Sequence, residues 1–153
     1  MTGAHDARHD NDPFQLNRFV SAQERVYEGV LEELRDGQKR SHWIWYIFPQ
    51  IEGLAYSSTS EYYAITGIEE ARQYLDHPVL GVRLMECTQI LLAIEGRSIS
   101  QIFGYPDDMK LRSSMTLFAQ VSAPRSVFVR VLDKYFNGEH DDKTLRILEK
   151  LQN

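Results

Sequence analysis

The segment SHWIWYIFPQ, residues 41–50, decides the fold class of this 153-residue chain. Two tryptophans, a tyrosine and a phenylalanine fall within six positions of it. Burying such a run removes roughly 150–250 Å² of surface per aromatic residue from water. As a strand it would be apolar on both faces and would need partner strands, yet no other segment alternates apolar and polar residues. We therefore expect a short helical turn, or an extended stretch that passes through a helical core.

The N-terminal part of the sequence predicts one long helix. Asp12 is a candidate N-cap, Pro13 suits the first helical position, and Gln15 at the third position would complete a capping box. Gly37 is the expected stop. Apolar residues recur at helical spacing between these signals, at Leu16, Phe19, Val20, Tyr27, Val30, Leu31 and Leu34.

Prolines, glycines and polar caps divide the rest of the chain into further short helices. They are expected at residues 58–65 and 68–76, after Pro78, from Ser98 to Gly104, after Pro106, between Pro124 and Gly138, and after Asp141. The predicted fold is all-α, a compact bundle of about seven to eight short-to-medium helices, with irregular or extended structure only around residues 41–50.

Composition narrows the class of protein. Residues 1–11 are polar and predict a disordered tail, and residues 12–153 predict a single helical domain. The sequence shows neither a secretory signal nor a stretch of 18 apolar residues, so we expect a protein that does not enter a membrane. The single cysteine suits a reducing compartment, and we therefore expect a cytoplasmic protein. The net charge of -5 argues against general nucleic-acid binding.

The aromatic run has two interpretations. Its large side chains could simply form core, which is the usual role of such residues. Alternatively, Trp43 and Trp45 form a stacking wall for a flat ligand. The polar residues Lys39, His42 and Gln50 frame the run, and binding pockets combine apolar walls with a few polar groups in this way.

The segment after Pro106 also carries two interpretations. It could be an ordinary amphipathic helix with a solvated flank, or Lys110, Ser113 and Ser114, at i, i+3 and i+4, could bind a phosphate or carboxylate. In the first helix, Arg18 and Gln23 lie near the apolar stripe; the Gln23 amide would bond either a neighbouring helix end or a ligand.

The histidines do not show metal-ligand spacing, so we expect no metal and no cofactor. His42 is the most plausible proton-transfer group if the protein is an enzyme, because an unperturbed histidine pKa near 6.5 suits that role. The sequence contains no glycine-rich phosphate loop, G-x-S-x-G or H-E-x-x-H motif.

Several segments together resemble the uncharacterised bacterial family called domain of unknown function 1810. The resemblance covers about residues 12–150 and implies a mainly helical protein with no established activity. Many members carry the label calpastatin, although calpastatin is a disordered inhibitor built of repeats and this sequence has none. The segments are DPFQLNRFVSAQ (12–23), KRSHWIWYIFPQ (39–50), YYAI (62–65), HPVLGVRL (77–84), IFGYPDDMKLRSSMTLF (102–118) and the closing Phe136, Gly138 and DKTL (142–145).

A weaker likeness is to the helical NADAR domains, which are linked to NAD and ADP-ribose metabolism and act as N-glycosidases. The comparable elements are residues 18–23, Ala71, residues 110–118 and Leu132. The Glu-His pair of that family is missing, since Asn17-Arg18 stands in its place.

Two functional hypotheses follow. In the first, the polar positions converge on a pocket for a nucleotide-like or phosphorylated small molecule, and an NAD- or ADP-ribose-related hydrolase is the enzymatic form of this hypothesis. In the second, it is a non-catalytic helical module that acts through protein contacts. The sequence leaves the oligomeric state open. The ligand-binding residues of the first hypothesis are Arg18, Gln23, Lys39, His42, Trp43, Trp45, Gln50, Lys110, Ser113 and Ser114.

Overall fold

The helix signals of the sequence become ten helices within residues 12–152, the part of the chain that the computed structural model describes. The all-α prediction is confirmed, but the expected number of seven to eight helices was too low. The predicted tail at residues 1–11 lies outside the described residues. The helices are α2 (Asn17–Glu24), α3 (Tyr27–Arg35), α4 (Ile44–Ile47), α5 (Ser58–Tyr62), α6 (Ile68–Asp76), α7 (Leu80–Ala93), α8 (Ile99–Phe103), α9 (Asp107–Ala119), α10 (Val127–Phe136) and α11 (Asp142–Gln152).

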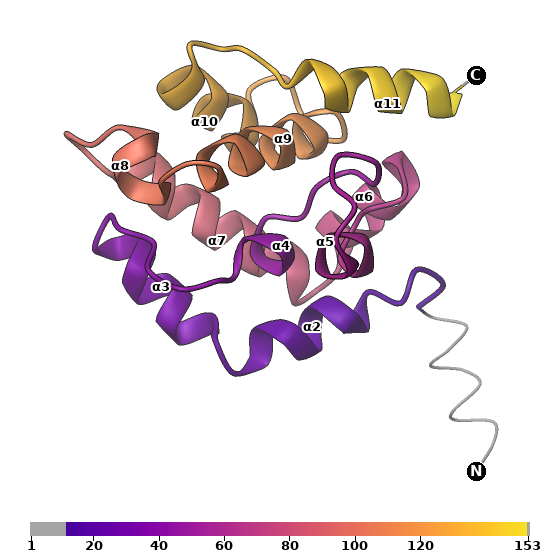
Figure 1. Ribbon diagram of the computed structural model, residues 1–153, viewed down its shortest axis with the longest axis horizontal. Coiled ribbons are helices and arrows are strands. Elements are labelled where there is room, and N and C mark those ends of the chain that lie inside the picture. The colour runs from indigo at the N-terminus through magenta and orange to yellow at the C-terminus, as the bar shows by residue number, and fades with distance from the viewer. Residues whose placement is uncertain (1–11, 153) are drawn as a thin grey trace.

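The helices surround one hydrophobic core. Figure 1 shows α9, α10 and α11 on one side of the molecule and α2 and α3 on the other, with α4 and α7 between them. Helix α7 packs against α3, α6 and α10, so it ties the N-terminal helices to the C-terminal ones. It enters the core closely at Gly81, where a Cβ atom would lie 2.0 Å from the carbonyl oxygen of Leu75. A side chain at this position would force α6 and α7 apart.

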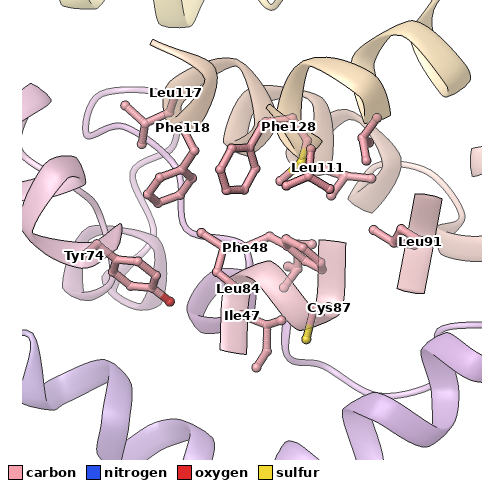
Figure 2. Packing of buried hydrophobic residues seen from close by; sticks show 14 of the residues in the cluster. Ile47, Phe48, Tyr74, Leu84, Cys87, Leu91, Leu111, Leu117, Phe118 and Phe128 are labelled. Carbon is pink, nitrogen blue, oxygen red and sulfur yellow. The ribbon is translucent and has the colours of Figure 1, made fainter. Parts of the chain in front are cut away.

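The aromatic run takes both of the conformations that its sequence allowed. Residues 44–47 form the single turn α4, and the chain then extends until Ile51 makes an isolated parallel bridge to Ile65. Phe48 is fully buried and lies beside residues of α7, α9 and α10 (Figure 2). The segment is therefore a short helix and an extended stretch threaded through a helical core.

The prediction of one long first helix was wrong. The chain breaks at Arg25 and Val26, which separate α2 from α3. Helix α2 packs against α4, whereas α3 packs against α7. Two different partners require two different axes, and the apolar periodicity on either side of the break cannot reveal that change of direction.

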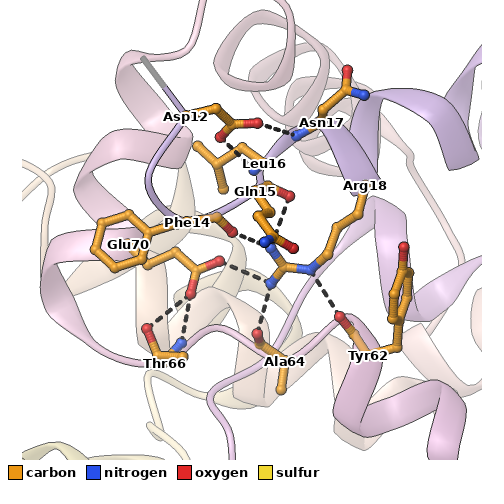
Figure 3. A network of polar contacts seen from close by, with 10 residues as sticks. All are labelled: Asp12, Phe14, Gln15, Leu16, Asn17, Arg18, Tyr62, Ala64, Thr66 and Glu70. Atoms are coloured by element: carbon orange, nitrogen blue, oxygen red, sulfur yellow. Dashed lines mark hydrogen bonds and ion pairs between the residues drawn. The ribbon is translucent and has the colours of Figure 1, made fainter. Parts of the chain in front are cut away.

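The predicted capping box at Asp12 was also wrong. Helix α2 begins at Asn17, and Gln15 has a φ of 54°, which lies in the left-handed region and not in a right-handed helix. The Asp12 carboxylate instead accepts the backbone N–H groups of Leu16 and Asn17, at 2.6 and 3.0 Å (Figure 3). Asp12 thus satisfies N–H groups at the start of α2 from a position further upstream than expected.

Shorter local signals were read correctly. Ser98 and Gln101 form a capping box at the start of α8, and Gly104 ends that helix with a positive φ. Asp141 accepts the backbone N–H of Thr144 at 3.1 Å and so caps α11. Each of these motifs lies within four residues, so no distant contact is needed to form it.

Candidate functional site

The Asp107 carboxylate brings the two predicted lysines together. Its Oδ2 atom lies 2.7 Å from Lys39 Nζ, and its Oδ1 atom lies 3.4 Å from Lys110 Nζ. Asp107 is the first residue of α9, and Lys39 lies in the loop that precedes α4. Two segments far apart in the sequence therefore meet at one carboxylate, with two positive charges and one negative charge.

Each of these lysines also lies over a tryptophan. Lys110 Nζ is 4.2 Å from the centre of the Trp45 ring, and Lys39 Nζ is 4.9 Å from the centre of the Trp43 ring. Trp43 is fully buried, whereas Trp45 is half-buried. Only Trp45 thus remains partly accessible to a ligand from solution.

Trp45 lines a shallow cleft between the end of α4 and α5. The volume of the cleft, as the space open to the centres of water-sized molecules, is about 20 Å³, which is room for about one water molecule. It is lined by Trp45, Gln50, Ile51, Glu52, Gly53, Leu54, Ala55, Ser60, Glu61, Tyr63 and Ala64.

Gln50 presents an unused amide to this cleft. The residue as a whole is only 9% exposed, and its side chain makes no hydrogen bond to another residue within residues 12–152. The backbone carbonyl of Gln50 is engaged, because it accepts the N–H of Ile65 at 2.9 Å. The amide atoms of Gln50 are not fully buried, so they can bond a water molecule or a ligand in the cleft.

A buried carboxylate, Glu33 on α3, holds the loop before α4 in place. It accepts the backbone N–H groups of Arg40 and Ser41, the Ser41 hydroxyl and the Trp43 indole N–H, at 2.6–3.0 Å. Burial by itself would raise the pKa of Glu33, but these hydrogen bonds outweigh burial and lower the pKa to about 2. The network holds the buried Trp43 side chain in place.

Arg18 lies in a different network. Its guanidinium donates to the Glu70 carboxylate at 2.9 Å, and Glu70 is buried (Figure 3). The remaining N–H groups donate to backbone carbonyls at 2.6–3.1 Å, those of Phe14, Gln15, Tyr62 and Ala64. The donors of Arg18 are therefore all used within the protein, and they attach α2 both to the segment around α5 and to α6.

Gln23 is buried and bonded at both ends of its amide. Its Nε2 atom donates to the backbone carbonyl of Tyr46 at 2.7 Å and to the Tyr74 hydroxyl at 3.2 Å. Its oxygen accepts from Arg83 at 3.2 Å. The sequence predicted that the Gln23 amide bonds either a neighbouring helix end or a ligand. The structure shows hydrogen bonds to neighbouring helices.

The other predicted residues are spread around α4 and α9. His42 is exposed and is not part of the cleft lining. Ser113 donates to the carbonyl of Met109 at 3.2 Å, while the Ser114 hydroxyl is fully buried and has no partner among the described residues. The structure thus brings together Lys39, Lys110 and the two tryptophans, with Gln50 nearby, and places Arg18 and Gln23 in networks of their own.

Several residues of this region escaped the sequence analysis. Glu33, Asp107, Glu52 and Glu61 resemble solvated surface carboxylates in a linear sequence, and Tyr63 resembles core. The spacing of Asp107 and Lys110, at i and i+3, was a usable signal for a pair. The sequence contains no such signal that Glu52, Glu61 and Tyr63 line one cleft, because that arrangement depends on the chain reversal between Ile51 and Ile65.

Within residues 12–152, no group of three or more histidine, cysteine, aspartate or glutamate side chains is arranged to hold a metal ion. No helix in the same range is long and apolar enough to cross a membrane.

The fold and the cleft define an all-α protein with a small, aromatic-lined concavity beside a charged cluster. Residues 13–148 match the family described as "Protein of unknown function (DUF1810)", and the chain belongs to this family. It is similar to a solved structure, that of the conserved hypothetical protein Rv1873 from Mycobacterium tuberculosis. That similarity has a TM-score of 0.89 and 51% identity over 90% of this chain and 99% of the other. No curated protein matches the chain.

Proposed function

We propose that the protein binds a small nucleotide-like or phosphorylated molecule in the cleft beside α4. The observation that carries this proposal is the half-buried indole of Trp45, which lines the cleft and has Lys110 Nζ over its ring. A flat ring would pack against Trp45 and Tyr63, and the unused amide of Gln50 would supply a donor and an acceptor. Lys110 would meet an anionic group. The cleft is shallow, so it suits one ring better than a whole dinucleotide.

Hydrolysis of an NAD- or ADP-ribose-like molecule is the more demanding form of this proposal. Such chemistry uses a carboxylate that transfers a proton or stabilises the developing charge. Glu52 and Glu61 line the cleft and are the candidates for that role, whereas His42, the candidate from the sequence, lies outside the lining. Incubation with NAD and ADP-ribose, followed by NMR, would detect a released base or ribose; Glu61→Gln would abolish the release.

Tryptophan fluorescence and thermal unfolding together test the binding proposal. A ligand at a hundredfold excess over its Kd stabilises the protein by about 2.7 kcal/mol, which is a rise in Tm of several degrees. We expect AMP, NAD, ADP-ribose or a sugar phosphate to give this shift and to quench the emission of Trp45. Trp45→Phe should remove the quenching, and Lys110→Ala should weaken binding of the phosphorylated compounds. Absence of both signals across the panel would contradict the proposal.

The exposed tyrosines favour the second hypothesis, a protein-interaction module. Tyr56 and Tyr105 are 80% and 83% exposed, and aromatic residues are enriched where proteins bind each other. Cross-linking and affinity capture with wild type and a Tyr56→Ser, Tyr105→Ser variant would test it. A partner retained by wild type and lost by the variant would support this function.

A further inference from the structure

The lining of the cleft has a charge that its ligand must complement. Two carboxylates, those of Glu52 and Glu61, belong to the lining, and no lysine or arginine does. Within residues 12–152, neither carboxylate lies within 4.0 Å of a cationic nitrogen, although seven other ion pairs are present. The cleft therefore carries two negative charges that no ion pair within residues 12–152 neutralises.

The cations next to the cleft leave less unpaired charge than its two carboxylates carry. Arg18 donates to the carbonyl of Ala64, a lining residue, but its charge is matched by Glu70 at 2.9 Å. Lys110 lies over Trp45 and is 3.4 Å from Asp107. Because Lys39 and Lys110 share the one carboxylate of Asp107, one net positive charge remains beside the cleft, against the two negative charges of Glu52 and Glu61.

The uncharged part of the lining suits a flat cation. Trp45 already accepts one cation, Lys110, against its ring, at a distance typical of a cation–π contact. Tyr63 supplies a second aromatic ring, and the exposed Tyr62 packs edge-on against it with ring centres 4.8 Å apart. Gln50, nine-tenths buried and without a protein partner, supplies an amide that can bond a polar substituent of the ring.

We infer that the ring bound in this cleft is a flat organic cation, such as an N-alkylated aromatic heterocycle, held by Trp45 and Tyr63 and neutralised by Glu52 and Glu61. This inference rests on the proposed function, because it names the class of ring that the same cleft takes. A phosphorylated ligand would then carry its positive ring in the cleft and its negative group toward Lys110.

A pair of probes that differ only in charge tests the inference. N1-methylnicotinamide is a cation, and nicotinamide is the neutral ring of nearly the same shape. We expect the cation to bind about tenfold or more tightly in calorimetry or NMR titration at low salt. Its affinity should fall as sodium chloride is raised, since the Debye length shortens, while the affinity of nicotinamide should not change.

Variants of the lining carboxylates separate charge from shape. The double variant Glu52→Gln, Glu61→Gln should bind both probes with nearly equal affinity. Both side chains are exposed, so the variant should fold normally, which its thermal unfolding would verify. Glu69→Gln is the matched control, because Glu69 is an exposed glutamate of α6 outside the lining. It should keep the preference for the cation.

Equal binding of the two probes to wild type would overturn the inference and leave the proposed function standing. Binding of neither probe at millimolar concentration would also overturn it, and the panel of nucleotides would then decide the proposed function separately. A preference for the cation that survives in the double glutamine variant would show that the charge is recognised elsewhere on the protein, which likewise overturns the inference.

Discussion

The indole N–H of Trp43 donates to the buried carboxylate of Glu33 across 3.0 Å. This bond joins the loop before α4 to helix α3, ten residues earlier in the chain. The same carboxylate accepts both backbone N–H groups of residues 40 and 41. One acidic side chain therefore sets the path of the loop that carries Lys39 to Asp107 and leads into α4 with Trp45.

Replacing Glu33 with alanine should strongly destabilise the protein. The change leaves two backbone N–H groups and the Trp43 indole N–H without their acceptor; the indole N–H is buried, and an unsatisfied buried donor costs about 1–3 kcal/mol. We expect the free energy of unfolding to fall by about 3 kcal/mol or more in urea denaturation. Glu32→Ala, on the exposed face of the same helix, is the matched control and should change stability by less than about 0.5 kcal/mol. Similar stabilities of the two variants would contradict this role of Glu33.

The lowered pKa of Glu33 makes part of the stability depend on pH. Its pKa falls from the usual 4.5 to about 2 in the folded protein, so the folded state favours the ionised carboxylate. This contribution, about 3 kcal/mol, is fully present above pH 4.5 and is lost as the pH falls from 4.5 toward 2. Urea unfolding at a series of pH values from 7 to 3 would measure it. Glu33→Gln cannot ionise and should lose less stability than wild type over that range, whereas parallel pH profiles would contradict the assignment.

The buried Ser114 hydroxyl should be dispensable for folding. It has no partner among the described residues, so Ser114→Ala removes an unsatisfied polar group and should leave stability unchanged or raise it. Thr116 on the same helix provides the contrast, because its hydroxyl accepts the N–H of Asp141 at 2.8 Å and donates to the carbonyl of Arg112. Thr116→Val should lower stability by about 1–3 kcal/mol. A substantial loss in Ser114→Ala, measured by thermal unfolding, would show that its hydroxyl has a partner in solution.

Cys87 should be inert in the folded protein. It is fully buried on α7, and burial raises the pKa of its thiol to about 12, so almost no thiolate is present at neutral pH. A thiol reagent at pH 8 should therefore label one cysteine per chain in denaturant and none in the native protein over the same period. Rapid labelling of the native protein would mean that α7 opens readily or that Cys87 is accessible.

Part of the candidate site could be predicted from the sequence. Aromatic and cationic residues occur close together in two segments of the sequence, and they predicted site roles for Lys39, Trp43, Trp45 and Lys110. The structure brings these four side chains into contact with one another or with Asp107. The cleft itself could not be predicted, since its walls come from Trp45 and from two segments within residues 50–55 and 60–64, which the bridge of Ile51 to Ile65 brings together.

Arg18 shows why polar residues are hard to assign from sequence. Its position beside an apolar stripe suggested a ligand contact, but a buried guanidinium can equally be satisfied by carbonyls and a carboxylate of the protein. Its partner Glu70 is 52 residues away, and two of the carbonyls belong to the segment around α5. No local pattern distinguishes these two outcomes.

Helix type and most helix ends follow from interactions within four or five residues. Examples are the Ser98 capping box, the positive φ of Gly104 and the Asp141 cap. Because such motifs need no distant contact, they can be predicted directly from the sequence. The direction of each helix, by contrast, follows from burial of its apolar face against distant elements. That requirement breaks the first helix at Arg25, places Asp107 between two lysines, and leaves Gln50 facing a cleft. Such contacts depend on which surfaces pack together after the chain has folded, and a linear sequence does not contain that information in any local pattern.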